Sequence, residues 1–101
     1  MTKCAVSLAE SALSDLQAIH QWYLDEGVPA VGRRLVNNVL NRLDTLSDHP
    51  LIGRQVPEFD NPSLRELIMP PFRIVYRHEP GKVRIVRVWR SERLLTFTGD
   101  E

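Results

Sequence analysis

The chain has 101 residues, with 13 basic and 13 acidic side chains, and carries no net charge when histidine is neutral. This length favours one domain, which we expect to span residues 1–101. Zero net charge argues against a protein that coats nucleic acid, so we expect no stable nucleic-acid binding by the chain alone. No apolar run approaches the roughly 18–20 residues of a membrane helix and no apolar signal region opens the chain, so the sequence predicts no membrane contact and a cytoplasmic location.

The first 27 residues predict a short strand followed by a helix. Residues 3–7 are the strand candidate, and Ser7 and Glu10 have the spacing of a capping box at a helix start. Gly27 is a natural C-terminal stop for this helix. Its apolar stripe, at spacings typical of a helix, consists of Ala12, Leu16, Ile19 and Tyr23, with Leu13 and Leu24 expected to widen it.

A second helix is predicted to begin at Pro29, which suits a first helical turn, and to end at residues 48–50. Its apolar stripe consists of Leu35, Val39, Leu43 and Leu46, with Val31, Val36 and Leu40 beside it. The short connection favours an antiparallel helical hairpin. Residues 50–63 are rich in proline and are expected to form a loop.

Three strands are predicted at residues 64–69, 72–78 and 83–89, the last two joined by a turn with proline and glycine at its centre. With Glu79 opposite Lys82, the expected cross-strand pairs are Tyr76 with Ile85, Ile74 with Arg87, and Phe72 with Trp89. The aromatic face is expected to pack on the helices. Arg87 fits poorly there, and a shift of one residue would exchange the two faces. The predicted fold class is α+β: a short N-terminal strand and an antiparallel helical hairpin packed on a small, mainly antiparallel sheet.

The chain has few of the residues that most often serve as metal ligands or nucleophiles. His20, His49 and His78 are not spaced as metal ligands, so we expect no metal site and no cofactor. Cys4 is the one cysteine and is expected to be a small buried thiol rather than a nucleophile. The remaining candidate chemistry lies in residues 65–93, where eight basic residues, seven of them arginine, face three acidic ones. Arginine suits bidentate contacts with carboxylate or phosphate, although a salt-bridged surface is the ordinary alternative.

Several motifs follow one another in a specific order. They are Ala12-x-x-Asp15-Leu16-x-x-Ile19 with Tyr23, Pro50-x-x-Gly53-Arg54 with Pro57-Glu58, Arg65-Glu66-Leu67, Phe72-Arg73-Ile74-Val75-Tyr76-Arg77, and the basic segment from Val83 to Arg93. Each motif alone is weak. Their order and spacing, from about Val6 to Leu95, resemble the ParE/RelE superfamily of bacterial toxins from type II toxin–antitoxin modules. The resemblance implies the same α+β fold.

The resemblance implies one of two activities, because the superfamily divides. RelE-like members are ribosome-dependent mRNA endonucleases that use basic residues and often a C-terminal tyrosine, whereas ParE-like members poison DNA gyrase. At the position matched to that tyrosine this chain has Phe97, which lacks a hydroxyl, and its lysines are limited to Lys3 and Lys82. Both observations favour the ParE-like branch. The segment 89–93, Trp-Arg-Ser-Glu-Arg, departs from the His-Gly-Arg-Arg-like ending of many ParE-like proteins.

The expected function is therefore that of a ParE-like toxin, which traps the cleaved-DNA complex of gyrase without being an enzyme and is neutralised by a cognate antitoxin. Two alternatives stay open: a RelE-like mRNA endonuclease that acts on the ribosome, and an inactive or non-toxic binding module. The residues expected to contact the target are Arg73, Arg77, Trp89, Arg90 and Arg93. The residues expected to contact the antitoxin are Trp22, Tyr23, Arg54 and Arg84. As an endonuclease, the chain would hold phosphate with Arg65, Arg73, Arg90 and Arg93.

Overall fold

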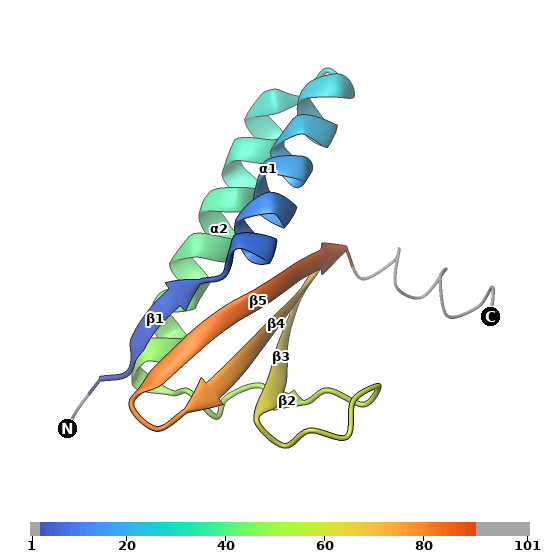
Figure 1. Ribbon diagram of the computed structural model, residues 1–101. Coiled ribbons are helices and arrows are strands. Elements are labelled where there is room, and N and C mark those ends of the chain that lie inside the picture. Colours follow the sequence, from blue (N-terminus) through green and yellow to red (C-terminus); the bar gives the residue numbers. More distant parts are fainter. Residues whose placement is uncertain (1–2, 91–101) are drawn as a thin grey trace.

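A helical hairpin packs on one face of a five-stranded sheet, as the computed structural model in Figure 1 shows for residues 3–90, the residues it describes. In chain order the elements are β1 (Ala5–Leu8), α1 (Glu10–Asp25), α2 (Pro29–Asp48), β2 (Arg54–Gln55), β3 (Leu64–Met69), β4 (Phe72–Glu79) and β5 (Lys82–Arg90). The strand order is β1-β5-β4-β3-β2, and only β1 with β5 is parallel. The predicted α+β class is confirmed.

The start of α1 differs from the prediction. Ser7 does not cap the helix, because β1 continues to Leu8 and Ser7 pairs with Arg84 of β5. The N-cap position is Ala9, which offers no side-chain oxygen to the free amides of the first turn. Ser7 is therefore part of the sheet and is not the N-cap of α1 that its capping-box spacing had predicted.

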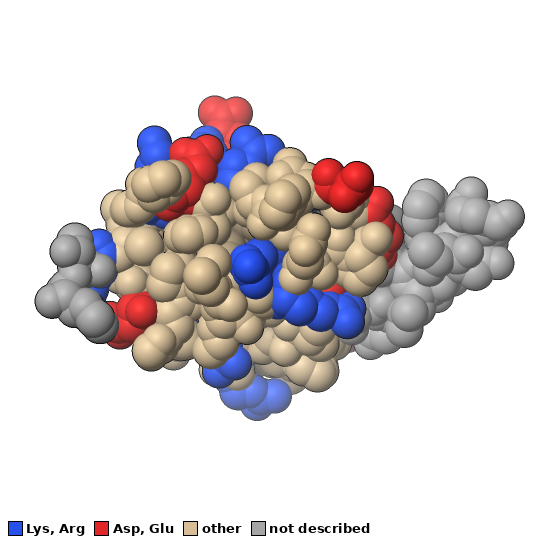
Figure 2. Space-filling view, turned by 90° about the horizontal axis from the view of Figure 1, so that it is seen from below, with Lys and Arg blue, Asp and Glu red and all other residues tan. Residues whose placement is uncertain are grey.

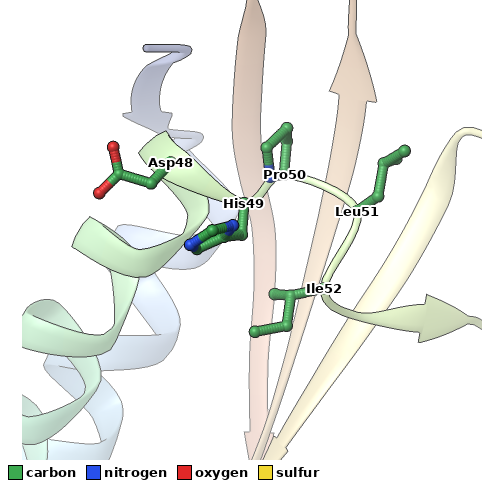
Figure 3. Close-up of a pocket in the computed structure, with 5 residues that line it drawn as sticks. All are labelled: Asp48, His49, Pro50, Leu51 and Ile52. Atoms are coloured by element: carbon green, nitrogen blue, oxygen red, sulfur yellow. The ribbon is translucent and has the colours of Figure 1, made fainter. Parts of the chain in front are cut away.

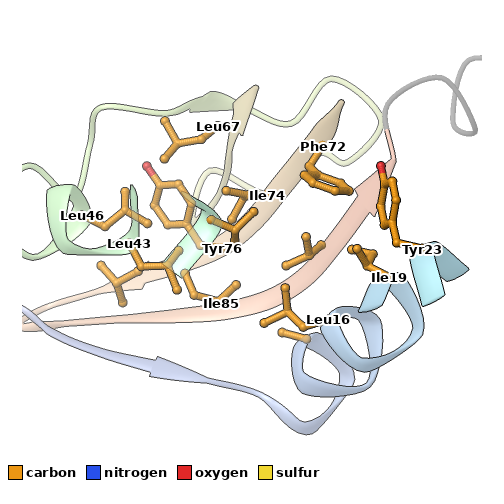
Figure 4. Packing of buried hydrophobic residues seen from close by; sticks show 14 residues of the cluster. Leu16, Ile19, Tyr23, Leu43, Leu46, Leu67, Phe72, Ile74, Tyr76 and Ile85 are labelled. Carbon is orange, nitrogen blue, oxygen red and sulfur yellow. The ribbon is translucent and has the colours of Figure 1, made fainter. Parts of the chain in front are cut away.

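The core lies between the hairpin and the sheet (Figure 4). The predicted stripe of α1 is buried from Ala12 to Tyr23, but Leu13 and Leu24 are 44% and 46% exposed and do not widen it. At the top of the hairpin, Gly32 of α2 lies so close to Tyr23 that an added Cβ would stand 2.7 Å from the Tyr23 Cβ. The missing side chain at Gly32 lets the two helices approach closely at this point.

The register of the β4–β5 hairpin is as predicted near the turn and wrong farther along. Glu79 pairs with Lys82 and Tyr76 with Ile85, and Gly81 has the positive φ of 76° that the second central position of a type II turn requires. The register then shifts by one residue on β5, so the next pairs are Val75 with Arg87, Ile74 with Val88, and Phe72 with Arg90. Val86 is the extra residue of this β-bulge.

The bulge explains why Arg87 does not lie in the core, where the predicted register would have placed it. It moves Arg87 to the face away from the core and puts Val88, which is 2% exposed, among the core residues. Burying a guanidinium among aliphatic side chains without a partner would be costly, whereas valine at that position adds to the core. The predicted aromatic face, including Phe72, Ile74 and Tyr76, does pack against the helices.

Candidate functional site

Two glutamates hold Arg73 on the sheet face opposite the helices. Arg73 donates to Glu66 from Nε and to Glu58 from both terminal nitrogens, with an Nη1–Oε2 distance of 2.9 Å. The Glu66 side chain is fully buried and also accepts a hydrogen bond of 2.6 Å from Arg54 Nε. We call Arg54, Glu58, Glu66 and Arg73 the Arg73 cluster. It ties the loop after β2 to the sheet, because Glu58 lies in that loop and Glu66 and Arg73 lie on β3 and β4.

The charges of this cluster stabilise one another. The hydrogen bonds that Arg73 donates to Glu58 lower the pKa of Glu58 below its usual value, and those that it donates to Glu58 and Glu66 raise the pKa of Arg73. Arg73 is 7% exposed, so the structure does not place it on an open surface. Its guanidinium is already occupied by carboxylates and is not available to an outside anion in this arrangement.

Tyr76 anchors the segment between α2 and β2 from the core side. Its hydroxyl accepts a hydrogen bond of 2.9 Å from the Gly53 amide and donates one of 2.8 Å to the Pro50 carbonyl. Burial raises the pKa of the Tyr76 hydroxyl. Arg65 donates to the Gly53 carbonyl at 2.8 Å, so both polar backbone groups of Gly53 are satisfied. A Cβ at Gly53 would lie 2.5 Å from the Glu66 carbonyl oxygen, which explains why this position has no side chain.

Helix α1 covers the edge of β5 where β1 ends. Asp15 accepts hydrogen bonds from Arg87 Nε at 2.8 Å, from Arg87 Nη2 at 3.0 Å and from the Val88 amide at 2.8 Å. One turn earlier, Ser11 donates to the Val86 carbonyl at 2.6 Å. The hydrogen bonds that Arg87 donates to Asp15 raise the pKa of Arg87. Two side chains of α1 therefore satisfy backbone groups that β1 is too short to reach.

Arg90 joins the C-terminal end of α1. Its Nη1 donates to the Tyr23 hydroxyl at 2.9 Å, and its guanidinium carbon lies 4.5 Å from the centre of a Trp22 ring and 5.6 Å from that of Tyr23. Trp22 is 46% exposed, whereas Tyr23 is buried. Trp89, half-buried, lies against Arg87 on the opposite face, with 4.9 Å from the guanidinium carbon to the ring centre.

Arg77 and Arg84 are direct cross-strand neighbours, and both are exposed on the face away from the helices. Figure 2 views the molecule from below and shows basic side chains in the middle of a largely uncharged surface, with acidic ones nearer its margin. Arg77 and Arg84 give the sheet face away from the helices a local positive charge.

The structure groups the predicted site residues differently from the expectation. Arg90 of the target set lies with Trp22 and Tyr23 of the antitoxin set, and Arg77 of the target set lies beside Arg84 of the antitoxin set. Arg54 is on β2, two strands away from β4, which carries Arg77. Arg93 and Phe97 lie outside the described residues.

The carboxylates that organise the site were missed as functional residues. Asp15, Glu58 and Glu66 appear in the sequence motifs, but the prediction assigned roles only to arginines and aromatic residues. One signal was present: Glu66 sits on the same strand face as Leu64 and Ile68, and a lone carboxylate between apolar side chains requires a buried cationic partner.

A surface hollow at the C-terminal end of α2 is lined by Asp48, His49, Pro50, Leu51 and Ile52 (Figure 3). Asp48 points away from Leu51 and Ile52. Within residues 3–90, no group of three or more His, Cys, Asp or Glu side chains could hold a metal ion, and no helix is long and apolar enough to cross a membrane.

Acid is expected to release the loop that carries Glu58. Because the folded-state pKa of Glu58 is lowered, its contribution to stability is present above the ordinary glutamate pKa and is lost as the pH falls through the lowered value. The effect should be modest and salt-sensitive, since the Glu58 side chain is 43% exposed. Urea unfolding at a series of acidic pH values measures it, and Glu58→Gln should flatten this part of the profile. An unchanged profile in Glu58→Gln would contradict the assignment.

Comparisons with known proteins agree with this architecture. The sequence model of the family described as ParE toxin of type II toxin-antitoxin system, parDE, matches residues 6–95. Toxin RelE2 of Caulobacter vibrioides is 34% identical over 84 residues, which cover 82% of this chain and 90% of that protein.

Two solved structures share the fold. That of the chromosomal ParDE toxin–antitoxin system from P. aeruginosa superposes with a TM-score of 0.74 at 22% identity, covering 87% of this chain and 96% of that chain. That of the RelBE2 complex from Mycobacterium tuberculosis gives a TM-score of 0.67 at 20% identity, covering 87% and 98%. With the family match over nearly the whole chain and the Caulobacter relative, they show that this chain belongs to the ParE/RelE superfamily of toxins from type II toxin–antitoxin systems.

Proposed function

We propose that this toxin acts as a ParE-like gyrase poison, which binds DNA gyrase in the cytoplasm and traps its cleaved-DNA complex, and that a cognate antitoxin neutralises it. The match to the ParE family model over residues 6–95 supports this branch, as does the fold shared with a solved ParDE system. The proposal makes the toxin a docking protein and not a nuclease.

The observation that carries this choice is that the described arginines of the endonuclease set are occupied by the protein itself. Arg73 is bound by two glutamates, Arg65 by the Gly53 carbonyl and Arg90 by Tyr23. Phosphoryl chemistry on RNA needs cations aimed at the phosphate and a general acid or base within hydrogen-bond reach. Cations already committed to internal partners are better suited to shaping a surface than to binding a transition state.

The proposed contact with gyrase uses the exposed or half-exposed members of the target set. These are Arg77, Trp89 and Arg90; Arg93, which lies outside the described residues, is also proposed as a contact. Arg73 is proposed to act indirectly, by holding the Glu58 loop beside them. For the antitoxin, exposed Trp22, Arg54 and Arg84 are the proposed contacts, and Tyr23 contributes by positioning Trp22 and Arg90. We expect the antitoxin segment to be extended, acidic and apolar, and to fold as it binds.

A cleavage assay with gyrase tests the proposal. Purified toxin is incubated with gyrase, ATP and relaxed plasmid, and the DNA is separated after treatment with detergent and protease. Linear DNA that increases with toxin dose is the expected result. Arg90→Ala should reduce it, whereas Arg42→Ala, which removes an exposed charge from α2, should not. Ordinary supercoiling at a large molar excess of toxin would refute the gyrase proposal.

The second candidate is ribosome-dependent mRNA cleavage, which the name of the Caulobacter relative, RelE2, favours. Primer extension on mRNA from a purified translation system detects such cleavage, with and without ribosomes. Normal growth during expression without an antitoxin would instead support a non-toxic binding module and would count against both toxin activities.

A further inference from the structure

Two arginines lie side by side on the sheet face opposite the helices, at a place where the fold gains nothing from them. Arg77 on β4 and Arg84 on β5 are directly opposite in the register, and Ser7 on β1 is the next residue along this row. All three side chains are exposed. Like charges directly opposite each other destabilise an antiparallel pair of strands, so the row does not serve stability.

The other basic side chains of the sheet are all engaged. Within residues 3–90, Arg77 and Arg84 are the sheet arginines for which the structure gives no hydrogen bond, ion pair or ring contact. The engaged residues are Arg54, Arg65, Arg73, Lys82, Arg87 and Arg90. Four of these six cations pair with carboxylates, and Arg65 and Arg90 bond a backbone carbonyl and a tyrosine hydroxyl, whereas the exposed Arg77–Arg84 pair is left able to bind an anion.

We propose that Arg77, Arg84 and the Ser7 hydroxyl form a docking site for carboxylate side chains on an extended acidic segment of a partner protein. Guanidinium groups bind carboxylates through paired hydrogen bonds, and a serine hydroxyl can donate a third. Neighbouring strands are about 4.8 Å apart, so the row spans about 10 Å. Acidic residues at alternate positions of an extended peptide are about 6.6 Å apart, which lets two carboxylates reach the same row.

The charges favour a peptide over a nucleic acid. Binding to a phosphate backbone depends on many cations that neutralise successive phosphates. Among residues 3–90, the other arginines on this sheet face have carboxylate partners, Lys82 is paired with Glu79, and the chain as a whole has no net charge. Two cations and a hydroxyl match a short acidic motif.

The inference rests on the proposed function only in that the antitoxin is the partner we expect to carry this segment. The gyrase assay can succeed or fail independently of this inference, because the test below uses a synthetic peptide and measures binding alone.

The probe is a peptide of alternating glutamate and valine, compared with one of alternating glutamine and valine and with a single-stranded oligonucleotide of equal charge. Binding to the full-length ¹⁵N-labelled protein is followed by NMR at low ionic strength. We expect saturable shifts of Arg77, Arg84 and their strand neighbours with the glutamate peptide only. No shifts, shifts elsewhere, or stronger binding of the oligonucleotide would overturn the proposal.

Arg84→Glu should weaken peptide binding at least about tenfold, since it removes charge-assisted hydrogen bonds and repels the carboxylates. Arg42→Glu is the matched control, because it changes the net charge equally at an exposed position of α2 and should leave binding unchanged. Arg84→Glu should also raise the urea midpoint by placing a glutamate opposite Arg77. If Arg84→Glu folds poorly, Arg84→Gln replaces it. Equal loss of binding in the control and the Arg84 variant would overturn the site.

Discussion

Replacing Arg73 with alanine is expected to lower the free energy of unfolding by about 3 kcal/mol, the lower end of what breaking a buried ion pair costs. Glu66, whose side chain is fully buried, would lose its buried cationic partner. Arg54 would remain bound to Glu66, but it is 63% exposed and compensates only in part. Glu58 would also lose its anchor on the sheet. Urea unfolding followed by tryptophan fluorescence gives the measurement.

Two further variants separate charge from shape at this position. Arg73→Lys keeps the charge but loses the planar fork that serves both glutamates, so it should fall between the parent and alanine. Glu66→Gln combined with Arg73→Ala removes the stranded charge and should recover part of the loss. A change for Arg73→Ala of less than about 0.5 kcal/mol, typical of a surface substitution, would show that the cluster is not a stabilising unit.

Replacing Asp15 with alanine should cost about 2 kcal/mol of unfolding free energy, because one carboxylate accepts three hydrogen bonds, two of them from a charged group. Solvent screening limits the effect, since the Arg87 side chain is 42% exposed. Asp15→Asn should lose less, because an amide oxygen can still accept from the Val88 amide. Thermal and urea unfolding together measure the change.

The matched control for Asp15 is another aspartate of the same helix. Asp25 accepts a hydrogen bond of 2.8 Å from Gln21 on an exposed surface, so Asp25→Ala should change stability by no more than about 0.5 kcal/mol. Equal effects of the two alanine variants would contradict a special role for Asp15 in joining α1 to β5.

The sequence was sufficient to predict the elements whose patterns repeat locally. The stripe from Ala12 to Tyr23 and the proline at position 29 placed both helices, and the turn at 79–82 placed the last hairpin. Its register failed beyond Tyr76 because a bulge has no local signature here. The segment just after the bulge bonds Asp15, 73 residues away in sequence from Val88, and places Val88 rather than Arg87 in the core.

The sequence predicted which arginines belong to the candidate site, but it did not predict how they are arranged in space. Composition and resemblance singled out Arg73, Arg77 and Arg90, but each one's surroundings depend on residues brought close only by folding. Arg73 meets Glu58 across 15 residues and Arg90 meets Tyr23 across 67. Cross-strand register, which is one residue different from the simple expectation, decides which arginines face the core, the helices or solvent.

The contacts of Ser11 and Asp15 with β5 also bear on self-association. An unpaired strand edge is a template on which another copy of a chain can add a strand. Here β1 covers the edge from Lys82 to Ile85, and the two α1 side chains occupy the Val86 carbonyl and the Val88 amide beyond it. Side chains of helix α1 thus occupy backbone groups of this edge as far as Val88. By occupying the Val88 amide, Asp15 leaves one fewer free donor on this edge for another strand to pair with.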